Sequence, residues 1–211
     1  MPSASFAGFR ALARQGNVVP VCLELLADCL TPVTAWMAAA GRSRRSFLLE
    51  SIEGGERIAR YSFAGRDPYL VLSSRGPVLT EQRGGARRRR EGELLEALRE
   101  HLRGLRPAPA PGLPRFTGGA VGYISWETAR RFEPSAGEPA AGGRGGTPDA
   151  WFGFYDTVLA FDHARQTLLL IASVLTDRDG RALAAQHRDA LRRLESLASA
   201  LARGPSAAAG L

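Results

Sequence analysis

The chain has 211 residues, of which 45% are hydrophobic. This is enough to bury a core and argues against an intrinsically disordered protein. The formal net charge of +7 is compatible with nucleic-acid binding, but all 28 basic residues are arginine. Arginine without lysine, beside many Ala and Gly residues, is typical of GC-rich coding, so an Arg-rich nucleic-acid binder is the less favoured class.

Neither a membrane protein nor a secreted one is indicated. No stretch reaches the roughly 20 apolar residues that cross a bilayer, and the N-terminus lacks the pattern of a signal peptide. Cys22 and Cys29 lie seven residues apart in a stretch that we interpret as a helix. Their Cα atoms would then be about 10 Å apart, too far for a disulfide. We therefore expect reduced core thiols in a cytoplasmic protein.

Two helices and a hairpin are predicted in the first 75 residues. Apolar residues over 21–30 have helical spacing, and Thr31-Pro32 is a cap followed by proline that begins a second helix, which Gly41 ends. A hairpin follows, with a first strand over 47–49, a turn over 53–56 and a return strand over 57–64. A short strand over 69–73 comes after Asp67-Pro68.

The middle of the chain is predicted to alternate between loops and packed elements. The four arginines at 87–90 are interpreted as a solvated loop before an amphipathic helix over 91–105. Residues 107–114 indicate a stiff Pro/Ala spacer. Three glycines then occur in a strand-like segment, where they are expected to allow the close approach of another backbone: Gly118, Gly119 and Gly122.

Two adjacent strands and a long helix are predicted in the last third. The strands are joined at Asp162-His163, and the helix over about 179–203 turns five leucines inward before Gly204-Pro205 ends it. The pattern favours an α+β fold with an antiparallel sheet and packed helices. We expect one domain over 1–203, a flexible insertion over 134–148 and a disordered tail or linker over 204–211.

No catalytic or metal-binding motif stands out. The glycines fit neither the Walker pattern nor the dinucleotide fingerprint. The three histidines and two cysteines lack metal-ligand spacing, and each histidine is expected on the surface or in a turn: His101, His163 and His187. We assign no catalytic residue, no metal ligand and no cofactor to this chain.

Glu50 and Ser51 interrupt an otherwise apolar first strand. In a purely structural interpretation the strand ends there, with Ser51 bonded to the turn backbone and Glu50 paired with Arg57 or Arg60. In a functional interpretation these residues bind a small ligand with both charges and apolar bulk, since a carboxylate can neutralise an ammonium group. The residues alone leave both open.

Four segments together resemble anthranilate synthase component I. They are GNVVPVCLELLADCLTPVTAW, FLLESIEGGERIARYSFAGRDP, PRFTGGAVGYISWE and PDAWFGFYDTVLAFDH. The resemblance as a whole covers nearly the entire chain, from about Gly16 to Val174. FLLES with RYSF is specific to the N-terminal, regulatory domain of that family. The related aminodeoxychorismate synthase component shares the glycine-rich segment, with a poorer match expected around FLLES.

The resemblance implies a function and a set of partners. Enzymes of this family convert chorismate and ammonia to anthranilate and pyruvate with Mg²⁺, and a separate glutamine amidotransferase subunit supplies the ammonia. Tryptophan, the end product, inhibits by binding the N-terminal domain at the L-L-E-S element. By this match Ser51 would contact tryptophan, with Leu49 and Glu50 alongside.

The family's chorismate-binding domain, which carries the Mg²⁺ ligands, is expected to be absent from this chain. We therefore expect a fragment or split subunit that is inactive until a chorismate-binding domain or subunit is supplied. A free-standing module that binds a small ligand stays open as an alternative.

Overall fold

The computed structural model describes residues 5–41, 43–51, 60–128, 135, 147–176 and 182–204. Two compact units share the chain: the first contains residues 1–67, 105–119 and 155–211, and the second contains 68–104 and 120–154. Each unit is built on one five-stranded sheet, and the strand pairs with an established register are antiparallel. The expected α+β class is confirmed, and the strands are divided between two antiparallel sheets. None of the described helices combines the length and apolar character needed to cross a bilayer.

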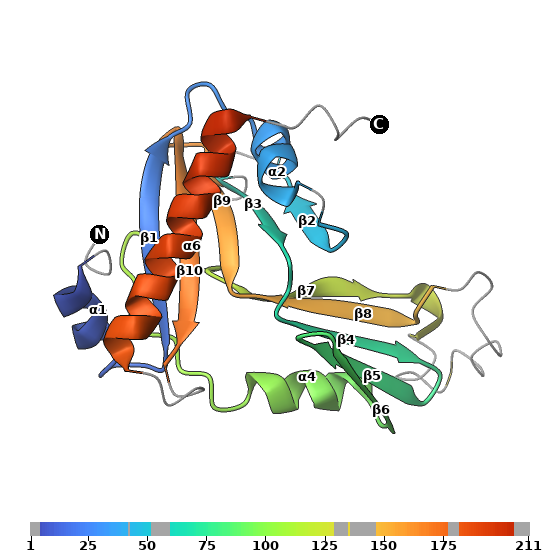
Figure 1. The fold of residues 1–211 in the computed structure, drawn as a ribbon. Helices are drawn as coiled ribbons and strands as arrows, with labels where there is room; N and C mark the ends of the chain where they lie inside the picture. Colours follow the sequence, from blue (N-terminus) through green and yellow to red (C-terminus); the bar gives the residue numbers. More distant parts are fainter. Residues whose placement is uncertain are drawn as a thin grey trace. The chain divides into compact units, whose positions relative to one another are not determined.

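The sheet of the first unit has the strand order β1-β10-β9-β3-β2 (Figure 1). Helix α6 packs on β10 and β1, and α2 packs on β2 and β3. The core between them contains Phe9, Ala35, Leu170 and Leu194, all fully buried. The element bounds are α1 Phe6–Leu12, β1 Val18–Leu26, α2 Pro32–Ala40, β2 Ser46–Leu49, β3 Tyr61–Arg66, β9 Thr157–Asp162, β10 Thr167–Leu175 and α6 Leu183–Arg203.

The second unit has the strand order β6-β5-β4-β8-β7, with α4 packed on β4. Leu94 and Ala97 of α4 are buried against Leu70, Leu72 and Phe154. The element bounds are β4 Leu70–Arg75, β5 Val78–Arg83, β6 Ala86–Glu91, α4 Leu94–Leu102, β7 Gly119–Ile124, the 3₁₀ turn η2 Trp126–Thr128 and β8 Ala150–Tyr155.

The helix predicted over 21–30 is wrong, because this segment forms the edge strand β1. Val19, Val21, Leu23 and Leu25 alternate with a period of two and all pack on the helix-covered core. Cys22 is therefore buried on the strand, whereas Cys29 is exposed in the following turn, so only one of the two is a core thiol.

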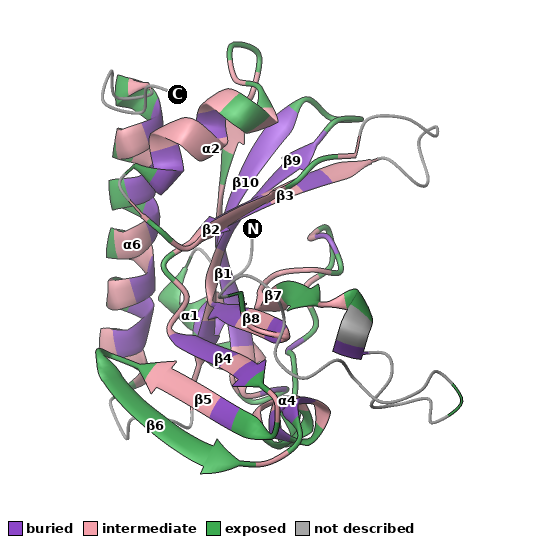
Figure 2. Cartoon of the chain, turned by 90° about the vertical axis from the view of Figure 1, so that its right-hand side faces the viewer, coloured by how far each residue is buried: buried purple, intermediate pink, exposed green. Residues whose placement is uncertain are grey.

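The loop predicted for the arginines at 87–90 is also wrong. Arg83 pairs with Ala86 across Gly84-Gly85, and both glycines have positive φ, 53° and 86°. A two-residue turn with positive φ at both positions is the preferred hairpin connection. The arginines therefore lie on β6, which is exposed along its whole length at the edge of the sheet (Figure 2).

The predicted junction at 162–163 lies between β9 and β10, as expected, but the preceding stretch is not one strand. The stretch breaks at Asp156, and its halves β8 and β9 join different sheets.

His187 is a further correction, because it was expected on the surface or in a turn. It is 5% exposed on α6, and its ring lies 5.0 Å from that of Phe9. The spacing of the polar residues in α6 did not show that α1 covers this position.

Several local predictions are confirmed. Thr31 caps α2 through a reciprocal capping box with Thr34, and Gly41 ends it with φ 53°. A Cβ on Gly122 would lie 1.9 Å from the carbonyl oxygen of Trp151, so the glycine does permit a close backbone approach. The predicted turn at 53–56 lies outside the described residues, as do most of the insertion (136–146) and nearly all of the tail (205–211).

Candidate functional site

The three residues predicted to bind an effector lie where β2 ends, in the first unit. Leu49 is the last residue of β2 and pairs with Phe63 of β3. Its side chain is 51% exposed, Glu50 is exposed and Ser51 is half-buried. An apolar side chain, a carboxylate and a hydroxyl thus occur in sequence at an accessible strand end.

Ser51 is held in place by a buried hydroxyl of the neighbouring strand. Its backbone N–H donates to Oγ of Ser62 over 3.2 Å, and Ser62 is completely buried on β3. The same Oγ lies 2.8 Å from Nε2 of His163, which follows β9. Three segments of the sheet therefore share one hydrogen-bond chain that ends at Ser51.

A second contact braces the start of β3. Arg60 donates from Nε to Oδ1 of Asp162 over 2.9 Å and from Nη2 to Oδ2 over 2.6 Å. Asp162 is 2% exposed, while Arg60 stays partly open to solvent and lies over the ring of Tyr61 at 5.0 Å. A bidentate guanidinium–carboxylate pair fixes both side chains in position.

The ionisation of this region follows from burial and that pair. Burial alone would raise the pKa of Asp162, but the hydrogen bond and positive charge of Arg60 outweigh it, so the pKa lies below its ordinary value. Burial, and after it the negative charge of Asp162, raises the pKa of Tyr61. At neutral pH the carboxylate is charged and the phenol is neutral.

The structure adds four residues that sequence reasoning did not assign to the site: Arg60, Ser62, Asp162 and His163. The sequence suggests Arg60 only as an ion-pair partner of Glu50. The sequence places Asp162 and His163 at a strand connection, and the available signal is an acidic residue followed by a histidine at the end of a buried strand. Their proximity to Ser62 depends on the pairing of β3 with β9.

The family resemblance implies Mg²⁺, an ion that takes oxygen ligands. In the part of the chain that the structure describes, no three His, Cys, Asp or Glu side chains gather closely enough to hold a metal ion. We therefore assign no Mg²⁺ ligand among the described residues.

This arrangement offers three kinds of group to a ligand. Glu50 offers a negative charge, Ser51 a hydroxyl and Leu49 an apolar surface, whereas Ser62 and His163 support them from behind. Such a set suits a zwitterion with an apolar side chain, which is the chemistry of an amino acid.

Comparison with known proteins identifies similar sequences. A family model described as chorismate binding enzyme matches residues 44–209. The chain is 37% identical over 200 residues to anthranilate synthase component 1 of Synechocystis. This alignment covers 93% of the present chain and 39% of the Synechocystis protein. Identity to the protein of the same name from Streptomyces coelicolor is 39% over 199 residues, covering 94% and 34% respectively.

A solved structure is similar as well. The crystal structure of anthranilate synthase component I from Streptococcus pneumoniae matches with a TM-score of 0.51 and 26% sequence identity, over 82% of this chain and 36% of that one. The chain therefore spans between about a third and two fifths of the length of the relatives it matches.

Proposed function

This chain belongs to the chorismate-binding enzyme family, and from that premise we propose that it is the tryptophan-sensing N-terminal part of an anthranilate synthase component I. The observation that carries the proposal is the strand end at Leu49, Glu50 and Ser51, held by Ser62 and His163. The names of the relatives from Synechocystis and Streptomyces coelicolor support the same activity.

Tryptophan would bind this strand end through its three chemical parts. The ammonium group would pair with the Glu50 carboxylate, which is exposed. The Ser51 hydroxyl would donate to the ligand carboxylate, because the hydrogen bond to Ser62 Oγ is donated by the backbone N–H of Ser51 and does not involve its side chain. The indole would pack on Leu49, whose side chain is half accessible. Each contact is of a type that amino-acid sites use.

The effect on catalysis would be allosteric. In this proposal a chorismate-converting domain or subunit forms anthranilate and pyruvate, and a glutamine amidotransferase supplies ammonia. Tryptophan would lower turnover by favouring a state of the assembly that binds chorismate weakly. Linkage then requires chorismate to weaken tryptophan binding by the same factor.

The decisive experiment is Ser51→Ala in a full component I that contains this chain, with tryptophan inhibition measured against anthranilate formation. Losing a hydrogen bond to a charged group costs about 1.5–3 kcal/mol, so the inhibition constant is expected to rise about 10- to 150-fold while uninhibited turnover stays the same. Ser46→Ala, at the start of β2, serves as the matched control and should leave inhibition unchanged.

If Ser51 only ends the strand, the outcome differs in kind. Ser51→Ala would then lower the free energy of unfolding by about 1 kcal/mol and leave the inhibition curve where it was. That result would contradict the proposed sensing role.

A further inference from the structure

A cationic cavity lies in the second unit and includes two of the β6 arginines. It has a volume of about 430 Å³ and is lined chiefly by three arginines and three hydroxyl-bearing residues, Arg75, Arg87, Arg89, Ser73, Ser74 and Thr80. This volume is within the range typical of small-molecule sites, about 300–1,000 Å³. None of the cavity-lining residues is acidic.

Strand register explains why these groups meet. Arg89 of β6 pairs with Thr80 of β5, and Thr80 pairs with Ser73 of β4, so the three form one row across the sheet. Side chains two apart on a strand share a face, which adds Arg87 and Arg75 to the face that carries this row. The Cα atoms of Arg87 and Arg89 are thus spaced about 7 Å apart along the strand.

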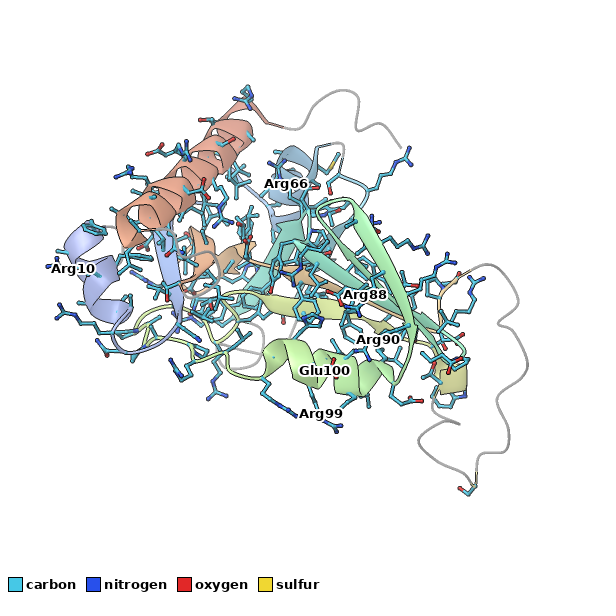
Figure 3. The ribbon with its side chains drawn as sticks, turned by 60° about the horizontal axis from the view of Figure 1, so that its bottom comes forward. Arg10, Arg66, Arg88, Arg90, Arg99 and Glu100 are labelled. Carbon is cyan, nitrogen blue, oxygen red and sulfur yellow. The ribbon has the colours of Figure 1, made fainter. Side chains whose placement is uncertain are left out.

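The opposite face of the same strand is organised differently. Arg90 donates to Oε2 of Glu100 on α4 over 2.7 Å, so its charge is compensated within the fold (Figure 3). Arg87 and Arg89 have no carboxylate within 4.0 Å among the described residues. Glu91 lies on the same face of β6 as Arg87 and Arg89, two residues beyond Arg89, but it does not line the cavity.

We propose that this cavity binds a small anion that carries a phosphate group. Guanidinium groups donate in a planar fork that matches phosphate oxygens, and the hydroxyls of Ser73 and Thr80 add further donors on the same row. Two uncompensated positive charges that repel each other would gain most from a ligand with a double negative charge. The proposal does not depend on the tryptophan site, which lies in the first unit.

Titration of the purified 211-residue chain with inorganic phosphate and with pyrophosphate, by calorimetry at constant ionic strength, tests this site. Arg89→Gln removes a cavity charge and is expected to weaken binding at least about 10-fold. Arg88→Gln is the matched control, because Arg88 is exposed on the same strand and alternation places it on the face of Arg90. The control removes the same net charge and should change affinity by less than about 3-fold at physiological salt.

Each outcome decides the proposal. Binding of either probe that is lost in Arg89→Gln and kept in Arg88→Gln supports the proposal. If phosphate binds, the site takes one phosphate group. If only pyrophosphate binds, the site takes two. Equal weakening in both variants would show diffuse attraction to a basic surface and would overturn it. Absence of binding of both probes, or binding unchanged in Arg89→Gln, would overturn it too. Circular dichroism of both variants checks that the sheet has formed.

Discussion

Oγ of Ser62 lies 2.8 Å from Nε2 of His163, although 101 residues separate them in the sequence. The serine is completely buried and also accepts the backbone N–H of Ser51. The end of β2 is thus tied to the end of β9 through one hydroxyl, which makes this atom the support of the candidate site.

Ser62→Ala removes that support and should weaken both the fold and the site. The N–H of Ser51 and the His163 ring each lose a partner, so the free energy of unfolding is expected to fall by about 1–3 kcal/mol. Urea denaturation measures this loss, and Ser46→Ala should stay within about 0.5 kcal/mol of the parent chain. A Ser62→Ala variant as stable as the parent would show that the hydroxyl contributes nothing.

The contribution of Asp162 to stability should depend on pH. Arg60 holds its pKa below the ordinary value in the folded state, so its contribution is fully present above the unfolded pKa of about 3.9 and is lost as pH falls through the lower folded pKa. We expect the difference in free energy of unfolding between the parent chain and Asp162→Asn to be largest near pH 7. It should shrink below about pH 4, as followed by urea denaturation at a series of pH values. A difference that stays constant down to pH 2 would contradict this.

The two cysteines should differ sharply in reactivity. Cys22 is buried, and burial, followed by the charge of Glu24, raises its pKa to about 12, whereas Cys29 is exposed. Because the thiolate is the reactive form, DTNB at pH 8 is expected to label one thiol per native chain and two after denaturation. Cys29→Ser should abolish the native reaction, and Cys22→Ser should leave it intact. Rapid labelling of both thiols in the native chain would contradict the assignment of residues 18–26 to a buried strand.

Gly122→Ala should disrupt the pairing of β7 with β8. The added Cβ would lie 1.9 Å from the Trp151 carbonyl oxygen and 2.7 Å from Cα of Phe152, and backbone atoms cannot move aside as a flexible side chain can. We expect a loss of about 2 kcal/mol or more and faster amide hydrogen exchange in both strands. Gly84→Ala is the control: its φ of 53° imposes a cost, but no atom lies within 4 Å, so exchange in β7 and β8 should not change. Unaltered exchange in Gly122→Ala would mean that the added methyl group fits without separating the two strands, and would contradict this prediction.

What the sequence determined by itself was mostly local. Helix α2 could be predicted because its cap, its first proline and its terminal glycine lie within eleven residues and act through bonds formed inside that segment. The leucine stripe of α6 was equally readable, because a helix repeats every 3.6 residues whatever it packs against. The motif at Leu49, Glu50 and Ser51 was also visible as a polar interruption, although its role in binding stays a prediction.

Tertiary structure decided whatever depends on a distant partner. Residues 18–26 form a strand because β10 lies beside them in antiparallel register, with Leu26 paired to Thr167 and Val19 paired to Val174. This pairing with a distant segment outweighs the helical spacing of the leucines. The arginines of β6 lie on two faces with different environments only because β5 aligns them. Ser62, Asp162 and His163 meet through the register of β3 with β9, and a shift of one residue would turn each side chain to the opposite face.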